Sequence, residues 1–314
     1  MKRLALVKLA KRKENVFRAF DILGREIQLE GKETVVIKVL LPGFKEIYAN
    51  THVDTVEAVI SFLQRFPSIK KIVVAEGSSG AYYRRNTKDV FRRFKFSHLE
   101  EGGKVELMDL DDIPHTEEVP VTLYDGTPST VRICQPPGDY TISVAPPKTH
   151  DLLILSLGMV NMIGFVHPED KLKIYGLKPE EGSKRSLYSP PLFSKVLRVA
   201  HKNLAELISR VHPDLSYIDG LYGMEGKGPL KGSPVFHGFA IASSDYVAVD
   251  SLGAYVMGFQ PDEIGYIHYA ARKGLGSTDY TTAVGERLDY VKFPYRAHPN
   301  LESQRKWRET PHGR

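Results

Sequence analysis

Carboxylates, amines and glycines are concentrated in one segment, IDGLYGMEGKGPLKGSP, which spans residues 218–234. Asp219 and Glu225 supply two carboxylates, which can hold a hard cation or exchange a proton with a substrate. Lys227 and Lys231 supply amines that can pair with these carboxylates or bind an anionic substrate. A structural tight turn needs only one or two glycines, so this composition favours a functional loop.

The same segment resembles two nucleotide-binding loops without matching either. Gly223 and Gly228 have the outer spacing of the phosphate loop, but Pro229 stands where the lysine belongs. Gly226, Gly228 and Gly232 are spaced one residue too far apart for the dinucleotide fingerprint. The HExxH and GxSxG patterns are absent as well, so neither a zinc protease nor an ordinary serine hydrolase is indicated.

Other ionisable residues stand where predicted strands end. Glu76 ends the apolar run IVVAE, and Ser78 and Ser79 follow it. Ligands of parallel α/β sheets bind beyond the carboxyl ends of the strands, so residues at these ends should meet at one edge. The same rule selects polar residues from separate parts of the chain, namely Lys38, Lys148, His150, Asp219, Asp245 and Asp250.

These positions define a candidate site with three kinds of residue. The catalytic candidates are Glu76, His150, Asp219 and Glu225. The candidates for binding an anion are Lys38, Ser78, Ser79, Lys148 and Lys227. The candidate cation ligands are Asp219, Glu225 and Asp250.

Some candidates also have a structural explanation. Lys38 would then face solvent from its strand, and His150 would belong to a capped surface loop. Asp245 and Asp250 open a predicted helix, where negative charge is stabilising, and for Asp245 this explanation is favoured.

Strands and helices alternate along most of the chain, which is typical of a parallel sheet. Short apolar runs predict strands over residues 34–41, 70–77, 151–158, 215–219 and 235–243. Helical spacing predicts helices over residues 51–66, 86–94, 192–211 and 246–257. Thr51 with Asp54 has the spacing of a capping box, and Asn86 is the expected N-cap of the second helix.

The predicted fold class is therefore α/β, with a mostly parallel sheet and flanking helices, Rossmann-like but without the nucleotide fingerprint. A smaller β-rich insertion is expected around residues 111–150, with a hairpin at Asp125 and Gly126. Residues 1–290 are expected to form a single α/β domain, and residues 291–314 an irregular C-terminal tail.

Composition limits the class of protein. The 314 residues are 42% hydrophobic and 26% charged, which is ordinary for a globular chain, and no membrane-spanning run is present. The apolar patch near the N-terminus is interrupted by Lys8, so we expect a first strand there and a cytoplasmic protein. A single cysteine, Cys134, cannot form an intramolecular disulfide or an iron–sulfur cluster, and we expect it in the core.

The basic excess is concentrated in YYRRNTKDVFRRFKF, residues 82–96. Interleaved basic and aromatic residues are found in nucleic-acid-binding segments, in which Arg84, Arg85, Arg92 and Arg93 would contact phosphates. The alternative is a solvated helix face with Phe91 and Phe94 directed inward, and this alternative is favoured.

Three stretches identify a family resemblance: VVAEGSSG, PPKTHDLLILSLGMVNMIG and IDGLYGMEGKGPLKGSPVFHGFAIASSDYVAVD. In order and spacing they resemble the uncharacterised family called domain of unknown function 362, over about residues 34–280. The resemblance implies an α/β fold. The residues at family motif positions are Glu76, Lys148, Thr149, His150, Asn161, Asp219, Glu225, Lys227, Asp245 and Asp250. Thr149 and Asn161 thereby join the candidates for binding a ligand.

Two positions depart from the family pattern. Val160 precedes Asn161 where the family usually has a lysine, and Lys38, Val39 and Leu40 stand where it has Lys-Pro-Asn. The resemblance implies that this chain is a divergent member at these positions.

The favoured hypothesis is an enzyme that acts on a small anionic metabolite by acid–base chemistry, with a divalent metal as an optional aid. Glu76 and His150 would exchange protons, and Lys148 and Lys227 would hold the anion. Two alternatives stay open: a nucleic-acid or polyanion binding module, and a redox-associated protein that works with an external iron–sulfur partner, as in fused relatives of the family.

Overall fold

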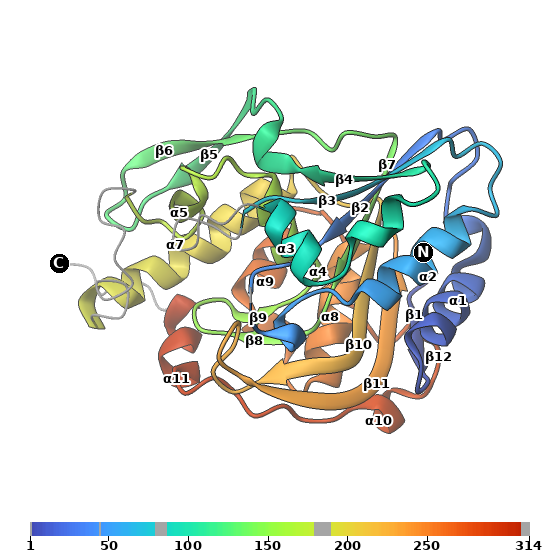
Figure 1. Ribbon diagram of the computed structural model, residues 1–314. Helices are drawn as coiled ribbons and strands as arrows, with labels where there is room; N and C mark the ends of the chain where they lie inside the picture. Colours follow the sequence, from blue (N-terminus) through green and yellow to red (C-terminus); the bar gives the residue numbers. More distant parts are fainter. Residues whose placement is uncertain (1, 44, 79–86, 179–189, 309–314) are drawn as a thin grey trace.

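The computed structural model describes residues 2–43, 45–78, 87–178 and 190–308. Its centre is a sheet with the strand order β12-β1-β11-β10-β7-β2-β3-β4 (Figure 1). The strands of this path are β1 (Ala5–Lys8), β2 (Thr34–Val39), β3 (Lys71–Glu76), β4 (Val105–Asp109), β7 (Tyr140–Ala145), β10 (Leu215–Glu225), β11 (Ser233–Ser243) and β12 (Val284–Gly285). Two short strands, β8 (Lys148–His150) and β9 (Ile154–Ser156), extend the sheet beside β10.

The pairing confirms a mostly parallel sheet. Strands β10, β7, β2, β3 and β4 are parallel neighbours, so their carboxyl ends lie at one edge. Strand β11 is antiparallel to both β10 and β1. The predicted first strand is β1, and it pairs at the far side of this antiparallel strand.

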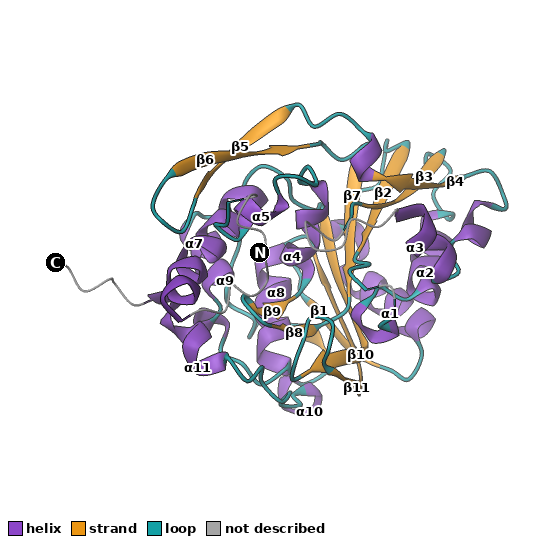
Figure 2. Ribbon diagram, turned by 60° about the vertical axis from the view of Figure 1, so that its left-hand side comes forward, coloured by secondary structure: helices purple, strands orange, loops and turns teal. Residues whose placement is uncertain are grey.

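Helices cover both faces of the sheet (Figure 2). One face carries α1 (Arg12–Leu23), α2 (Val53–Leu63) and α3 (Thr87–Arg93). The other face carries α4 (Gly158–Asn161), α5 (Lys171–Ile174), α7 (Pro190–Ile208), α8 (Tyr246–Val256) and α9 (Gly265–Arg272). Short turns α10 (Leu288–Val291) and α11 (Leu301–Gln304) lie near the C-terminus.

Alternation along the central strands divides the core in two. In β2, the side chains of Val35, Ile37 and Val39 join the core under α1 and α2. Val36 joins the core under α7 and α8 instead. Because side chains of a strand alternate between faces, Lys38 is directed toward the α4 and α8 side.

The N-terminus of α2 differs from the predicted capping box. The cap is His52, whose ring nitrogen accepts a hydrogen bond from the Asp54 amide. Thr51 is occupied elsewhere, because its hydroxyl accepts from Leu40 N at 2.8 Å and donates to Val144 O at 2.7 Å. The threonine therefore joins β2 to β7. The expected N-cap of α3, Asn86, lies outside the described residues.

The β-rich insertion is confirmed but is shorter than predicted. Strands β5 (Glu117–Thr122) and β6 (Pro128–Ile133) form the expected antiparallel hairpin, with Gly126 at a positive φ of 88°. Strands β7 and β8 belong to the central sheet instead. Every residue of β7 is buried, as expected of a central strand, although the surrounding prolines had suggested an insertion.

The largest correction concerns Asp219, which does not end a strand. Strand β10 continues through the glycines to Glu225 and pairs with β11 as a long hairpin, with a register shift between Gly220 and Tyr222. A Cβ on Gly220 would lie 2.3 Å from the Phe239 ring, and a Cβ on Gly223 would lie 2.3 Å from the Tyr295 hydroxyl. These two glycines therefore make room for aromatic side chains.

The C-terminal segment is attached to the domain over its described length. Trp307 is buried, and its indole nitrogen donates to Glu263 O at 2.8 Å. Gln304 is also buried and donates to His150 O at 2.6 Å. Residues 291–308 thus cover the domain rather than extend from it.

Replacing Gly220 by alanine should destabilise the protein by about 1–3 kcal/mol, because the new methyl group overlaps the buried Phe239 ring. Urea unfolding would measure the loss. Gly102 is the matched control, since a Cβ there meets no atom within 4 Å and alanine should be tolerated. Equal stability of the two variants would contradict the packing explanation.

Candidate functional site

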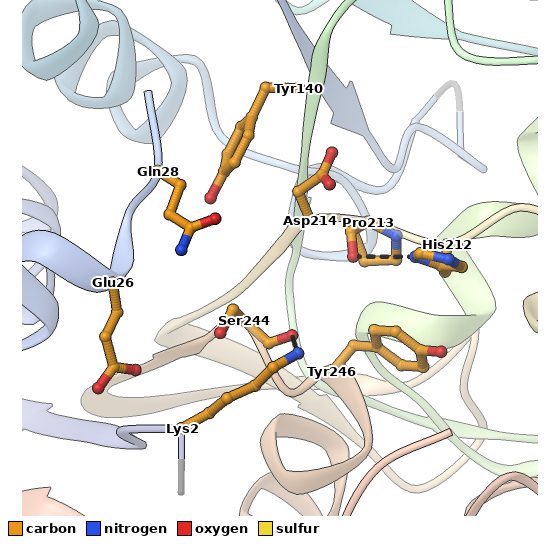
Figure 3. Close-up of a pocket in the computed structure, with 9 residues that line it drawn as sticks. All are labelled: Lys2, Glu26, Gln28, Tyr140, His212, Pro213, Asp214, Ser244 and Tyr246. Atoms are coloured by element: carbon orange, nitrogen blue, oxygen red, sulfur yellow. Dashed lines mark hydrogen bonds between the residues drawn. The ribbon is translucent and has the colours of Figure 1, made fainter. Parts of the chain in front are cut away.

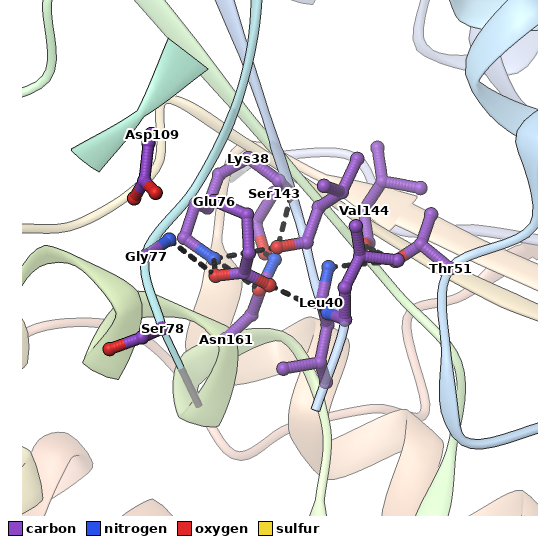
Figure 4. Close-up of polar contacts among 12 residues, drawn as sticks. Lys38, Leu40, Thr51, Glu76, Gly77, Ser78, Asp109, Ser143, Val144 and Asn161 are labelled. Carbon is purple, nitrogen blue, oxygen red and sulfur yellow. Dashed lines mark hydrogen bonds and ion pairs between the residues drawn. The ribbon is translucent and has the colours of Figure 1, made fainter. Parts of the chain in front are cut away.

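A buried ion pair lies at the carboxyl ends of β2 and β3 (Figure 4). Lys38 Nζ is 2.6 Å from Glu76 Oε1, and both side chains are almost completely inaccessible to solvent. The second oxygen of Glu76 accepts from Leu41 N at 2.6 Å, and the first also accepts from Gly77 N at 2.9 Å. Each carboxylate oxygen therefore has a donor, as a buried charge requires.

Asn161 completes the environment of Lys38. Its amide oxygen accepts from Lys38 Nζ at 2.9 Å, while its amide nitrogen donates to Lys38 O and to Ser143 Oγ. The Ser143 hydroxyl in turn donates to Gly158 O at 3.1 Å. Burial lowers the pKa of Lys38, and the charge of Glu76 opposes this shift.

Asp250 acts on this cluster indirectly. One of its oxygens accepts from Gly158 N at 2.9 Å and the other from Met159 N at 3.1 Å, so it caps the short helix that ends at Asn161. Burial raises the pKa of Asp250 to about 7, and the two backbone donors oppose the rise. Asp250 therefore positions the amide that holds Lys38.

Lys148 is a second buried amine near the pair. Its side chain is 0% exposed, and its only hydrogen bond among the described residues goes to Ala49 O, at 2.6 Å. Burial lowers its pKa to about 7; the Glu76 charge opposes the shift and the Lys38 charge adds to it. Lys148 thus lies within electrostatic reach of the pair but has no carboxylate of its own.

Lys171 is a third buried amine, and sequence analysis missed it. Its Nζ donates to Ser78 O and lies 3.5 Å from Asp111 Oδ1. Burial lowers its pKa, with Asp111 and Glu76 opposing. Ser78 N donates to the other Asp111 oxygen at 3.1 Å, while the Ser78 hydroxyl has no partner among the described residues.

Packing around the ion pair is tight. A Cβ on Gly164 would lie 2.3 Å from Lys38 Cε and 2.8 Å from Glu76 Oε1. A Cβ on Gly77 would lie 2.3 Å from Gly164 O. Glycine at both positions lets two backbone segments approach the charged groups. The predicted anion ligand Ser79, next along the chain, lies outside the described residues.

Asp219 is not part of this cluster. It lies on the α1 and α2 face of the sheet, where its Oδ2 accepts from Arg12 Nε at 2.9 Å and from Thr55 Oγ1 at 2.6 Å. Lys38 faces the opposite side, toward Asn161. The structure therefore separates Asp219 from Glu76, although the sequence rule had placed both at one strand edge.

Glu225 lies farther along β10, about 20 Å from Asp219 at a rise of ~3.3 Å per residue. Its carboxylate accepts from Arg296 N at 2.8 Å and lies 3.6 Å from the Arg296 guanidinium. Asp250 lies elsewhere again, where it accepts hydrogen bonds from Gly158 N and Met159 N. The three candidate cation ligands are thus apart, and no three His, Cys, Asp or Glu side chains within the described ranges are placed to hold a metal together.

The remaining candidates have structural contacts. His150 Nδ1 accepts from Leu152 N and Leu153 N, at 3.0 and 3.1 Å, and the ring stacks on Tyr175. Thr149 Oγ1 donates to Gly226 O at 3.0 Å. Lys227 is exposed on the hairpin loop. Asp245 caps α8 by accepting from Ala248 N, as its structural explanation predicted.

Two further predictions concern the core and the basic segment. Cys134 is buried, and burial raises the pKa of its thiol to about 12, in agreement with a core role. In the described part of the basic segment, Phe91 is buried and Phe94 is half-buried against the same core, while Arg92 and Arg93 are exposed, as in a solvated helix face. Residues 82–86, with Arg84 and Arg85, lie outside the described residues.

Comparison with known proteins agrees with the motif resemblance. The family model described as "Domain of unknown function (DUF362)" matches residues 35–255. A thylakoid-associated protein from Synechocystis sp. is 28% identical over 140 residues, which cover 45% of this chain and 39% of that protein. This chain therefore spans well under two thirds of that relative.

Two solved structures show distant similarity. The lactate racemase apoprotein from Thermoanaerobacterium thermosaccharolyticum aligns with a TM-score of 0.41 and 15% identity, over 68% of this chain and 50% of that one. A protein from Thermotoga maritima aligns with a TM-score of 0.44 and 9% identity, over 83% and 58%. Separately, no helix in the described ranges is long and apolar enough to cross a membrane. The cytoplasmic location stays a prediction.

Breaking the buried ion pair should be costly, whereas removing it whole should not. Glu76→Gln leaves Lys38 without its counter-charge and should cost about 3–5 kcal/mol of unfolding free energy. The double variant Lys38→Met with Glu76→Gln should regain much of this loss. Urea unfolding of both single variants and the double variant gives the coupling energy. Strictly additive effects would show that the pair is not coupled.

Lys148 should make stability depend on pH. Its pKa is about 7 when folded and 10.5 in the reference state, so between these values the unfolded chain binds more protons. Relative to Lys148→Met, the wild type should therefore gain free energy of unfolding as the pH rises, by about 1.4 kcal/mol per pH unit between pH ~7.5 and ~10. The gain is lost as the pH falls to about 7, the pKa of the folded state.

Urea unfolding at several pH values would measure this difference. The exposed Lys13 provides the control, because Lys13→Met should show no such slope relative to wild type. A flat difference for Lys148→Met would mean that Lys148 keeps an ordinary pKa.

Proposed function

This chain belongs to the DUF362 family of unknown function, and we propose that it is an enzyme that acts on a small anionic metabolite beside the buried amine cluster. We define this cluster as Lys38, Lys148 and Lys171 with the carboxylate of Glu76. Lys38 and Glu76 lie at the carboxyl ends of β2 and β3, the edge at which open α/β sheets bind their ligands. Lys148 and Lys171 are within electrostatic reach of this pair.

The observation that carries the proposal is the unmatched charge of Lys148. Lys38 pairs with Glu76 and Lys171 lies beside Asp111, whereas the Lys148 amine has, among the described residues, a carbonyl oxygen as its single hydrogen-bond acceptor. An isolated ammonium in a protein interior is unfavourable by several kcal/mol. A carboxylate or phosphate group of a ligand would supply the missing negative charge and would favour the protonated amine.

The ion pair supplies the acid–base component. Lys38 and Glu76 share a hydrogen bond of 2.6 Å, and burial disfavours the charged form of the lysine. Passage of the proton from Lys38 to Glu76 would convert the ion pair into a neutral amine and a neutral carboxylic acid, the forms that burial favours. Perturbed ionisable groups that meet at a sheet edge are a recognised mark of catalytic sites.

The proposal revises the roles expected from sequence. Lys148 keeps its role in anion binding, and Glu76 keeps its role in proton exchange. The partner of Glu76 in proton exchange becomes Lys38 instead of His150, because His150 accepts two backbone hydrogen bonds and is directed toward Tyr175. Lys227 is exposed on a different part of the hairpin and is not assigned to the anion.

Anion binding provides the direct test. Inorganic phosphate, acetate, pyruvate and succinate at about 10 mM should include at least one ligand that raises Tm by roughly 2 °C or more. Lys148→Met should lose this response because it lacks the amine. Lys13→Met should respond like the wild type, since that lysine is exposed on α1.

Circular dichroism would confirm that Lys148→Met is folded. The proposal fails if none of these anions affects Tm, or if the folded Lys148→Met variant responds as strongly as the wild type.

A further inference from the structure

A cavity with a volume of about 500 Å³ lies at the opposite edge of the sheet (Figure 3). It is bordered by Tyr140, the first residue of β7, and by Asp214, which immediately precedes β10. The amine cluster lies at the carboxyl ends of the neighbouring strands. The two sites share no residue, and the volume falls in the range of small-molecule pockets.

Aromatic side chains form part of the wall. Tyr140 and Tyr246 are buried, and the exposed His212 ring stacks on Tyr246 with 5.4 Å between centroids and 25° between planes. Burial raises the pKa of Tyr246 to about 12, and it also raises the pKa of Tyr140, with Asp214 adding to the effect. Both phenols therefore stay neutral at physiological pH and can contact a planar ring.

Charges of both signs border the same cavity. Lys2 Nζ donates to Ser244 O at 3.1 Å, which leaves two of its three hydrogens without a described protein acceptor. Asp214 Oδ2 accepts from Thr141 N at 2.7 Å, while its Oδ1 has no donor in the described part of the chain. Glu26 is already engaged by Arg3, through the backbone amide at 2.6 Å.

We propose that this cavity binds a zwitterionic molecule of the aromatic α-amino-acid class. Lys2 would bind the ligand carboxylate, Asp214 would bind its ammonium group, and the side-chain ring would pack against His212 and Tyr246. The cavity border carries the carboxylates of Glu26 and Asp214 and the amine of Lys2, and Arg3 pairs with Glu26. Two positive and two negative charges cancel, so the border favours a ligand with no net charge over a phosphate ester.

The site is independent of the proposed catalytic function. An aromatic ligand contributes ring contacts beyond its buried area, and each charge-assisted hydrogen bond is worth more than a neutral one. Specificity should therefore require all three parts of the ligand: the ring, the carboxylate and the ammonium group.

Calorimetry or saturation-transfer NMR with L-phenylalanine and L-tryptophan at about 10 mM would detect binding with Kd near 1 mM. L-alanine lacks the ring, phenethylamine lacks the carboxylate and 3-phenylpropionate lacks the ammonium group. Each of these should bind about tenfold more weakly or not at all.

Variants locate the site. Asp214→Asn and Lys2→Met should each weaken binding of the aromatic amino acid by about tenfold, and Lys13→Met should leave it unchanged. Asparagine can still accept from Thr141 N, which favours a folded variant. The proposal is overturned if neither amino acid binds the wild type, if the truncated analogues bind equally well, or if Asp214→Asn and Lys2→Met bind like the wild type. Lys148→Met should bind normally, which separates this result from the test of the amine cluster.

Discussion

The need to compensate buried positive charge links distant parts of this chain. Lys38 stands in a central strand between Ala75 and Ser143 and is completely buried, so its ammonium requires nearby acceptors. Glu76 comes from the next strand, and Asn161 comes from a helix more than a hundred residues later. That helix is capped by Asp250 from α8. Four segments are thereby held in one arrangement by a polar network inside the core, and a partly satisfied network would be strongly destabilising.

The glycines and charged residues of the β10–β11 hairpin have the composition of a ligand-binding loop, but in the structure they serve packing and attachment. Glycine beside charge is typical of ligand-binding loops, but Gly220 and Gly223 lie within a paired strand and adjoin Phe239 and Tyr295. The charged residues of the segment point to separate places as well. Asp219 holds α1 and α2 to the sheet through Arg12 and Thr55, whereas Glu225 holds the C-terminal segment through Arg296. The hairpin therefore organises the surrounding helices and tail.

The two edges of the sheet differ in their electrostatics. At the carboxyl ends, amines gather in the interior and the local balance favours an anion. At the amino ends, Lys2 and Asp214 border an open cavity whose charges cancel. The ion pair lies at β2 and β3 and the cavity at β7 and β10, so neighbouring parallel strands of one sheet provide two chemically distinct surfaces. A ligand at one edge would be separated from the other by the full length of a strand.

The sequence by itself determined the α/β class and the family motifs, and it selected Glu76, Lys38 and Lys148, which the structure buries. Apolar runs that end in a charged residue can be recognised from local composition alone. Ser143 could have been found in the same way, as a polar residue in the buried run YTISVA. Lys171 could not, because its surroundings in HPEDKLKIYG look like an exposed helix.

Only the tertiary structure decided which charges meet. The long hairpin pairing of β10 placed Asp219 beside Arg12 and Thr55, whereas Glu76 meets Lys38, and no local pattern reports on which partners a strand-end residue will reach.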